Sequence, residues 1–541
     1  MCKSFLQKLR EAPKEQYNTS AAAFTQIPDP VLAAPAKAYV DEKSGISVEA
    51  TAIPTSALPV RVEKEKRSPL DIAVDAAGSR WTLAITLALL VAWGIWGAVD
   101  GPEDTWQVIL QDVSSIQAYI SATLLMRQQA TSCRRVLGRI CTLISRSKSN
   151  ERMLGSISEK QRDQLRLSTH KVRADVMALT QNKEDWLDRL SNSIAAGVGS
   201  LVFLGIYVMG IIVWAAMGPS LQFSDTWQLD VNTATALEIT FTTVFLQNIR
   251  KQHERHLDKV IQAIETVDRD VEMKLRQMTG DTEMNQTVHS TPAQLNRWTT
   301  GIDMWAYIMG GNIGVLLSVI VFSVWIAVGS PLGFSDNWFL IIGTYTGLMG
   351  FIDGFTMKNV DHRESALAER HFQRLEDQDH NVFRLLDVEM PVSQQKTKQS
   401  LNLRISNAFG HYCGTTAASY GAFATVVTLI VIASAMQWTE TGQLLCNTPT
   451  MIIEGLLLIT LLQAHNTEDD RKRALYGDVL QRRLALDTHL AAWDAPAYVL
   501  PEVFTGEKGP LVPGLVVPPA YARGSLVIPR EKYQARQTAF W

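Results

Sequence analysis

Four acidic residues lie inside apolar stretches that are long enough to form membrane helices: Asp112, Glu238, Asp353 and Glu454. A carboxylate at that depth is costly and rarely faces lipid. When the surrounding segments are aligned, the last three acids fall within one helical turn, whereas Asp112 is off register. Carboxylate oxygens suit hard or borderline divalent cations, so these acids are candidates to line a metal path. The alternative is that each acid bonds to Ser, Thr or Asn on a neighbouring helix and serves only assembly.

A second set of acids occupies one equivalent position in four short loops: Asp104, Asp225, Asp336 and Glu440. Two of these loops read Asp-Thr-Trp-Gln, a side-chain acceptor followed three residues later by Gln, which is typical of a capped helix start. The functional interpretation is a ring of carboxylates that concentrates cations at the outer mouth of a path. The two interpretations are compatible, because an exposed cap keeps its charge.

Uncharged polar residues continue along one of these predicted helices. Two of them, Asn232 and Asn248, are further candidates to contact a metal on the path. The threonines of the same helix are interpreted as contacts between helices, which is an ordinary use of small polar residues in membranes.

Other chemistry is not indicated. The ten histidines fall outside the predicted membrane helices, and although His253 and His256 could receive metal on the inner side, a solvated helix face is the simpler interpretation. There is no phosphate-binding loop, nucleophile elbow or paired metal-hydrolase motif. The sequence therefore predicts neither an enzyme nor an ATP-driven pump, and it indicates no cofactor and no nucleic-acid partner.

These residues stand in an internal repeat. The stretch Trp214–Asn248 joins the end of one apolar helix to the whole of the next, and three degraded copies of it occur elsewhere. A shift of 121 residues toward the N-terminus aligns Asp104 with Asp225 and Trp106 with Trp227 without a gap. Shifts of 111 and 215 residues toward the C-terminus give the third and fourth copies. The chain is therefore predicted to contain four repeats of two helices.

Average composition conceals this organisation. With 541 residues, 46% hydrophobic content, a net charge of -3 and a mean hydropathy of +0.01, the chain resembles a soluble protein because long polar segments dilute the apolar ones. Windows of about 20 apolar residues are long enough to cross a bilayer. They fall near 81–99, 106–126, 195–217, 229–248, 309–328, 338–357, 417–436 and 443–464. The predicted fold class is an all-α polytopic membrane protein with eight transmembrane helices in a lipid bilayer.

Orientation follows from the basic residues. The segment between the second and third helices is rich in Lys and Arg, whereas the four short loops contain none. Both termini and the three long loops are therefore predicted to be cytoplasmic. Each long loop continues its membrane helix as an amphipathic one, and these extensions are expected to pack together. Pro449 predicts a later start for the last helix.

The predicted organisation alternates tails, repeats and cytoplasmic segments. The boundaries are a flexible tail (1–67), repeat 1 (68–127), a basic loop (128–187), repeat 2 (188–250), a helix (251–299), repeat 3 (300–358), a helix (359–404), repeat 4 (405–465), and a C-terminal helix and tail (466–541). The tail has no short apolar run behind a basic start, so the first membrane helix is expected to act as the signal. The five cysteines show no disulfide framework. Tryptophans at the predicted boundaries, including Trp93, Trp106, Trp214 and Trp227, are interpreted as interfacial anchors.

The block GPSLQFSDTWQLDVNT at 218–233, followed by FLQN at 245–248, is similar to the low-affinity iron permease family. The similarity is sharp over 188–260, good over 300–360, weaker over 70–127 and 405–465, and absent from both tails. It implies a plasma-membrane carrier of ferrous iron that tolerates other divalent metals, with Fe2+ as transported substrate. It brings no established set of metal ligands. Repeat 3 departs from the block, with Phe339 and Gly343 at the places of Gln228 and Asn232.

We therefore expect a transporter in which the acidic loops collect Fe2+ and the acids of the second helices pass it inward, driven by the membrane potential. One alternative is a divalent-cation channel built from the same residues. Another is a membrane scaffold or signalling protein whose intramembrane acids serve only assembly. The sequence leaves open self-association into a homo-oligomer.

Overall fold

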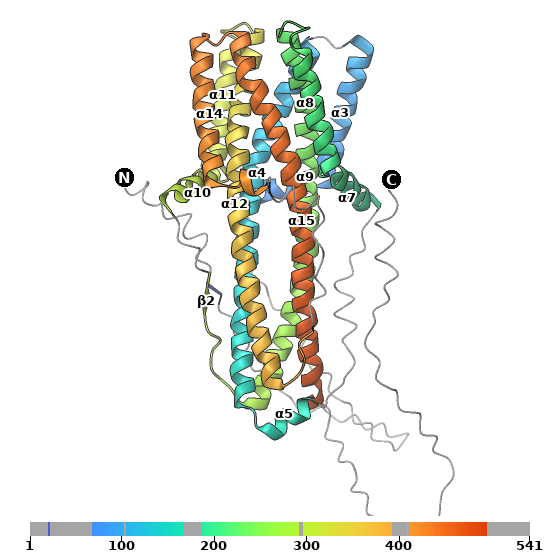
Figure 1. The fold of residues 1–541 in the computed structure, drawn as a ribbon, viewed down its shortest axis with the longest axis vertical. Helices are drawn as coiled ribbons and strands as arrows, with labels where there is room; N and C mark the ends of the chain where they lie inside the picture. Colours follow the sequence, from blue (N-terminus) through green and yellow to red (C-terminus); the bar gives the residue numbers. More distant parts are fainter. Residues whose placement is uncertain are drawn as a thin grey trace, which may run out of the picture. The chain divides into compact units, whose positions relative to one another are not determined.

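The computed structural model describes residues 20–21, 68–101, 104–166, 186–290, 296–391, 408 and 410–494. All of them belong to the first of the two units into which the chain divides, Met1–Asp494. The described part is almost entirely helical, which confirms the predicted all-α class (Figure 1). The N-terminal tail expected over 1–67 lies outside the described residues, except that Ser20–Ala21 forms strand β1. The expected C-terminal tail lies outside them beyond residue 494.

Four long helices form the centre of the described part, and each begins at one of the four loop acids. They are α4 (Asp104–Ser156), α9 (Asp225–Thr279), α12 (Asp336–Leu386) and α15 (Glu440–Asp494). Each continues from an apolar segment into a charged one without a break, as the sequence predicts. Pro449 lies inside α15, so the prediction that this helix starts later than its counterparts is wrong.

Four shorter helices precede the long ones in the chain and lie around their upper parts (Figure 1). They are α3 (Arg80–Asp100), α8 (Leu201–Met217), α11 (Asn312–Gly329) and α14 (Thr416–Ala435). No residue of α8 is buried, although the helix is apolar on every side. A helix with these properties is stable only in an apolar solvent, so the shorter helices face lipid and shield the long ones.

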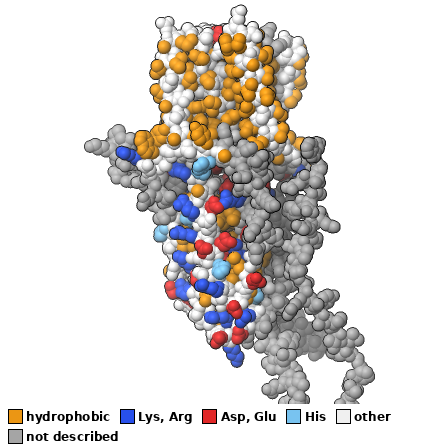
Figure 2. Space-filling view, viewed as in Figure 1, with side chains coloured by type: hydrophobic (Ala, Val, Ile, Leu, Met, Phe, Trp, Pro, Cys, Tyr) orange, Lys and Arg blue, Asp and Glu red, His pale blue; other side chains and the backbone are white. Residues whose placement is uncertain are grey.

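Each long helix has a membrane half and a polar half. The membrane halves are residues 104–126, 225–249, 336–357 and 440–464, and the polar halves are the remainders of the same helices. Figure 2 shows hydrophobic side chains covering the upper part of the visible face, and Lys, Arg, Asp and Glu gathered on the lower part. The change in surface chemistry occurs within continuous helices, which is the arrangement expected of helices that leave a bilayer for water.

Six helices of the described residues are long and apolar enough to cross a membrane, or seven if the bent pair α7–α8 counts as one span. The membrane half of α9 is not among them, because it carries many polar residues, including Asn232 and Thr242, which are fully buried. Eight transmembrane helices therefore remain a prediction. The multi-span membrane architecture itself agrees with the sequence.

An amphipathic helix precedes three of the shorter helices after a short break. These helices are α2 (Pro69–Ala77), α7 (Trp186–Val198) and α10 (Arg297–Met309), and the bend between α7 and α8 is 51°. After α2 and α7 a glycine is followed by a serine, Ser79 or Ser200, whose hydroxyl accepts the backbone N–H three residues later at 3.1 or 3.2 Å. These caps satisfy backbone groups that the helix start would otherwise leave unpaired in an apolar setting.

The polar halves pack into a bundle with an apolar core. Leu143, Ile264, Leu375 and Tyr476, one from each long helix, are fully buried in it. Buried charges lie beside this core: Arg483 is 2.8 Å from Asp268 and 2.7 Å from Asp379. These pairs cross from α15 to α9 and α12, so they fix the register of three helices.

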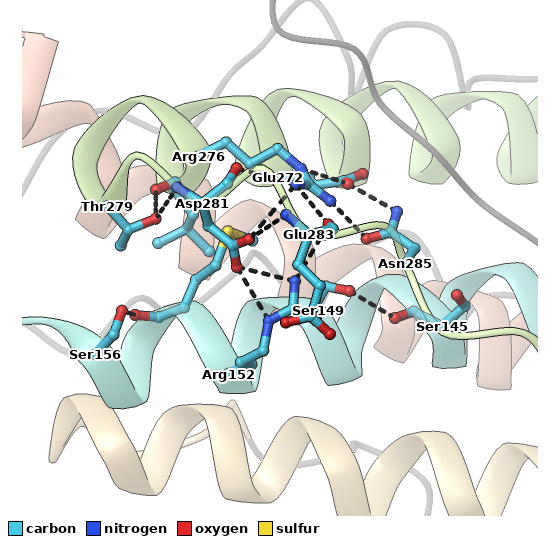
Figure 3. A network of polar contacts seen from close by, with 12 residues as sticks. Ser145, Ser149, Arg152, Ser156, Glu272, Arg276, Thr279, Asp281, Glu283 and Asn285 are labelled. Atoms are coloured by element: carbon cyan, nitrogen blue, oxygen red, sulfur yellow. Dashed lines mark hydrogen bonds and ion pairs between the residues drawn. The ribbon is translucent and has the colours of Figure 1, made fainter.

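The far end of the bundle is closed by the segment that follows α9. Figure 3 shows Arg276 pointing toward Asn285 and Glu272, and Arg152 of α4 toward Asp281. The same segment then forms strand β2 (Val288–His289), which pairs antiparallel with β1, so that Ser20 lies opposite His289. Helix α5 (Glu159–Arg166) completes this end.

Candidate functional site

The outer mouth is built by the hairpins that start the long helices. In the hairpins before α9, α12 and α15, the residues two and three positions before the first helical residue adopt the left-handed conformation. They are Gln222 and Phe223 (φ 55° and 50°), Gly333 and Phe334 (61° and 50°), and Gln437 and Trp438 (56° and 54°). A non-glycine residue there costs roughly 1–2 kcal/mol. The same strained turn at three equivalent positions brings each loop acid to the same place in its helix.

Asp225 is the first residue of α9, but it is not the cap. Ser224 holds the cap position, and its hydroxyl accepts the N–H of Trp227 at 3.3 Å. The predicted capping role of Asp225 is therefore wrong, because the hydroxyl one residue earlier satisfies the helix start. The Asp225 carboxylate instead accepts a hydrogen bond from Thr441 of the α15 hairpin at 3.4 Å. The backbone starts of α4 and α12 at Asp104 and Asp336 are described, but their side chains are outside the described residues.

Paired tryptophans lock three hairpins. Trp214 and Trp227 stack with ring centroids 4.0 Å apart, and each indole N–H donates to the backbone carbonyl of the other residue, at 2.8 and 3.0 Å. The same arrangement joins Trp93 to Trp106, with centroids 3.9 Å apart. Trp325 and Trp338 form the third pair.

These indoles are clamps between the two helices of a hairpin. Sequence reasoning interpreted them as anchors in the membrane interface, and it missed the signal that Trp recurs at a spacing of 13 residues in three repeats. Trp81 and Trp438 are 80% and 42% exposed, and their anchoring role stays a prediction.

The four membrane halves surround a common axis. Each long helix packs chiefly against two others, in the order α4, α9, α15, α12. Two small cavities lie between them, with volumes of about 20 Å³ and 10 Å³. Ala118 and Glu454 line both cavities. A volume near one water-sized sphere holds a single small molecule or ion, so the axis is narrow.

Glu454 is the predicted acid that lies on this axis. It is 7% exposed and stands between the two cavities. A methyl group at Gly350 of α12 would lie 2.4 Å from Glu454 Oε1, so the carboxylate occupies space that a larger residue would take from it. The sequence register of Glu454 predicted its depth, but not the glycine opposite.

Glu238 and Asp353 lie close enough for their charges to act on Glu454. The Glu238 carboxylate accepts a hydrogen bond from Thr242 at 2.6 Å and is directed toward Gly455 of α15. Asp353 accepts a hydrogen bond from the indole N–H of Trp305 at 2.8 Å. One oxygen of each acid, Glu238 Oε2 and Asp353 Oδ2, has no hydrogen-bond partner among the described residues. The three acids predicted to share a depth are thus brought together.

Asp112 and Asn232 lie nearer the outer mouth, and both are buried, at 7% and 0% exposure. Asp112 Oδ2 and both polar side-chain atoms of Asn232 lack a hydrogen-bond partner within the described ranges. Asn248 is different: its amide donates to the carbonyl of Gly78 at 3.3 Å and its oxygen accepts from Ser191 at 3.1 Å. Asn248 therefore holds the corner before α3 and is not free to contact a metal on the axis.

The inner end of the axis carries two basic residues that sequence reasoning did not single out. Arg250 of α9 and Lys358 of α12 are 6% and 3% exposed, and the charge of Asp361 acts on both. Arg250 Nε and Lys358 Nζ have no hydrogen-bond partner in the described part of the chain. The two cations come from α9 and α12, which are diagonal across the axis, and the charge of Arg250 acts on Lys358.

Histidines also gather below the membrane halves. His253 Nδ1 is 3.1 Å from His465 Nε2 and 3.4 Å from Asp469, whose carboxylate is held by Arg473 at 2.5 Å. Among the described residues, no group of three or more His, Cys, Asp or Glu side chains is arranged to hold a metal ion. A tight resident metal site built from those side chains is therefore not found in the described ranges.

Comparison with known proteins gives a consistent result. A sequence model of the family described as "Low affinity iron permease" matches residues 187–291, 301–392 and 402–485. The Schizosaccharomyces pombe protein named "Low-affinity iron/zinc ion transport protein fet4" is 38% identical, over 78% of this chain and 72% of its own length. The Saccharomyces cerevisiae protein named "Low-affinity Fe(2+) transport protein" is 34% identical, over 77% of this chain and 82% of its own. No solved structure matches significantly.

Proposed function

This chain belongs to the low-affinity iron permease family, and from that membership we propose that it carries ferrous iron across a membrane with low affinity, along the axis of its four long helices. The observation that carries the proposal is Glu454, a buried carboxylate between two cavities that are lined by all four membrane halves. A carboxylate on such an axis attracts a cation, and an ionisable group at this depth in a membrane usually marks an ion pathway.

Entry begins at the hairpins. Asp225 and its equivalents Asp104, Asp336 and Glu440 stand at the starts of the long helices, where a ring of negative charge raises the local concentration of cations. The charge at Asp225 is half-exposed and so remains accessible to ions in solution. Other divalent ions, including Zn2+, enter by the same electrostatics.

Passage then depends on the buried acids. Glu454, with Glu238 and Asp353 beside it, supplies carboxylate oxygens of the kind that suit borderline divalent ions. Because the described His, Cys, Asp and Glu side chains form no closed metal cage, the ion is held loosely and released quickly. Loose coordination explains low affinity. At the inner end Asp361, whose charge acts on Lys358, provides the next carboxylate.

No fuel is required for net uptake. A divalent cation that moves to a negative interior gains roughly 4.6 kcal/mol per 100 mV, twice the value for a single charge. The protein is therefore neither an enzyme nor a cofactor-dependent pump, and Fe2+ is its substrate. The polar halves and both termini lie in the cytosol, with the protein in the plasma membrane.

Uptake of radioactive Fe2+ into liposomes that contain the purified protein and an inside-negative potential tests this proposal. We expect saturable uptake, reduced at least about tenfold by Glu454→Gln, because the change removes the charge and keeps the shape. Glu376→Gln is the matched control, since Glu376 is an exposed acid of the polar half of α12. Normal uptake by Glu454→Gln would remove Glu454 from the path.

The same preparation separates the alternatives. A channel gives unsaturated ionic current, and a scaffold or signalling protein gives no metal uptake. Orientation is tested by tags in intact cells: one inserted at Gly333, in the α12 hairpin, should be labelled, and one at Gly155, near the end of α4, should not. The opposite labelling would invert the proposed topology.

A further inference from the structure

A ring of four hydroxyl groups lies just outside Glu454. Each long helix carries Ser or Thr ten residues after its first residue, and all four side chains are at most 3% exposed. The residues are Ser114, Thr235, Thr346 and Thr450. Ser114 and Thr346 line the smaller cavity together with Glu454, which places the ring on the axis. Two of the four residues thus line the axis, and Thr235 and Thr450 occupy the equivalent positions of the other two helices.

The four hydroxyl protons are all turned away from a ligand. Each hydroxyl donates to a backbone carbonyl three or four residues earlier in its own helix. The shortest distances are 2.9 Å for Ser114 to Gln111, 3.0 Å for Thr235 to Asn232, 2.8 Å for Thr346 to Ile342 and 2.8 Å for Thr450 to Asn447. A hydroxyl has one proton and two lone pairs, so each oxygen remains an acceptor. Such a ring favours a cation and offers nothing to an anion.

A layer of carboxamides lies about one turn farther out. This layer lies seven residues after the first residue of each long helix. Three of the helices carry a carboxamide there that is at most 3% exposed: Gln111, Asn232 and Asn447. The fourth helix, α12, has Gly343 at this position. The side-chain oxygen of each carboxamide has no hydrogen-bond partner among the described residues. Leaving a buried acceptor unpaired is costly, so three such oxygens at one depth suggest a ligand.

Gly343 lies beside the charged residue of this layer, Asp112. A methyl group there would lie 3.8 Å from Asp112 Oδ1 and 3.7 Å from Asn447 Nδ2. Asp112 thus comes to the place where the fourth carboxamide would stand, and its Oδ2 is also without a hydrogen-bond partner in the described ranges. The position of Asp112 outside the register of the other acids has a geometric explanation.

We propose that the carboxamide layer and the hydroxyl ring form a selectivity site in which a divalent cation exchanges water for neutral protein oxygens, with Asp112 as the single charge. The inference rests on the proposed transport along the axis. Oxygen donors of this kind suit Fe2+ and Mn2+, whereas metals that prefer nitrogen or sulfur gain less from them. This site determines which divalent metals bind most tightly on the path, and the acids around Glu454 then pass them inward.

Competition between metals during Fe2+ uptake into liposomes tests the site. Thr450→Val removes one oxygen and keeps the shape, so we expect the half-saturation concentration for Fe2+ to rise about fivefold. Asn447→His supplies a nitrogen ligand, and we expect preference to move toward Zn2+ by about tenfold. The matched control is Thr428→Val, because Thr428 makes the same bond within its helix, to Ala424 at 2.9 Å, but is exposed on α14.

Folding is checked by thermal unfolding of each purified variant, and Thr450→Ser, which keeps the oxygen, should restore the wild-type half-saturation concentration. If Thr450→Val and Asn447→His fold and keep the wild-type affinity and metal preference, the selectivity site is refuted even though transport stands. If the unmodified protein carries no Fe2+, the proposed function itself fails.

Discussion

The buried charges at the core of the polar half and those of the membrane half differ in their partners. In the polar half, Arg483 lies 2.8 Å from Asp268 and 2.7 Å from Asp379, and Arg146 lies 3.2 Å from Glu272. Each of these arginines forms an ion pair with a carboxylate, although some of its N–H groups are not directed well enough to count as hydrogen-bond donors. In the membrane half, Glu238 and Asp353 each keep one oxygen that has no hydrogen-bond partner among the described residues.

The contrast separates architecture from function. An ion pair that spans helices fixes their register, and removing one partner leaves an uncompensated charge. An unpaired acid in a membrane brings no such benefit, and its cost is accepted only where the group acts on a ligand. Substitutions in the polar half should therefore reduce stability, whereas those in the membrane half should reduce transport.

The largest expected effect is on stability. Arg483→Met leaves Asp268 and Asp379 without their shared partner, and we expect a loss of about 3–5 kcal/mol in the free energy of unfolding. Thermal unfolding of the purified protein measures it, and Arg134→Met, an exposed position of α4, is the control. A variant as stable as the control would show that the charge layer does not hold the bundle together.

The complementary change lies in the membrane half. Asp353→Asn keeps a group that can accept from Trp305 and removes the buried charge, so stability should hold or rise slightly. Fe2+ uptake should fall about tenfold, because an ion then meets one carboxylate fewer. Normal uptake with reduced stability would place Asp353 with the architectural charges and weaken the contrast.

The outer acids should show a smaller effect. Asp225→Asn removes an exposed charge and leaves the cap at Ser224 intact, so protein abundance should not change. We expect the apparent KM for Fe2+ to rise about twofold to threefold at low salt, and the difference to shrink in high salt, which screens exposed charge. A difference that does not depend on salt would contradict a role in concentrating ions.

The smallest expected effect is on the pH dependence of the stability of the polar half. His371 is 3% exposed, and burial, with Arg374 nearby, holds the pKa of its imidazole below the ordinary value of 6.5. The folded protein favours the neutral ring, so protonation of His371 in the unfolded chain favours unfolding. The stability that the neutral ring contributes is therefore full above pH 6.5 and is lost as the pH falls below it. Thermal unfolding of His371→Phe between pH 7.5 and 5.5 should therefore depend less on pH than that of the unmodified protein. An equal pH dependence would show that His371 does not contribute.

Much of this arrangement follows from the sequence, because helix starts and apolar windows are local signals. The acids at Asp225 and Glu440 predicted where long helices begin, and the depth of Glu454 followed from its register. What could not be predicted depends on contacts across helices. The hydroxyl at Ser224 is the cap in place of Asp225, the Glu454 carboxylate lies against Gly350, and Arg250 is buried below the membrane half of α9.

The central claim is that metal passes between the four long helices beside Glu454, and blocking that axis tests it most directly. Ala118 lines both cavities, whereas Ala234 is exposed on α9. Each is changed to cysteine in a functional background without the five native cysteines. Labelling by a small thiol reagent is followed by mass spectrometry, and Fe2+ uptake is then measured. We expect modification to abolish uptake in Ala118→Cys, to be slowed by Fe2+, and to leave Ala234→Cys active. Full labelling of Ala118→Cys with unchanged uptake would contradict an axial path.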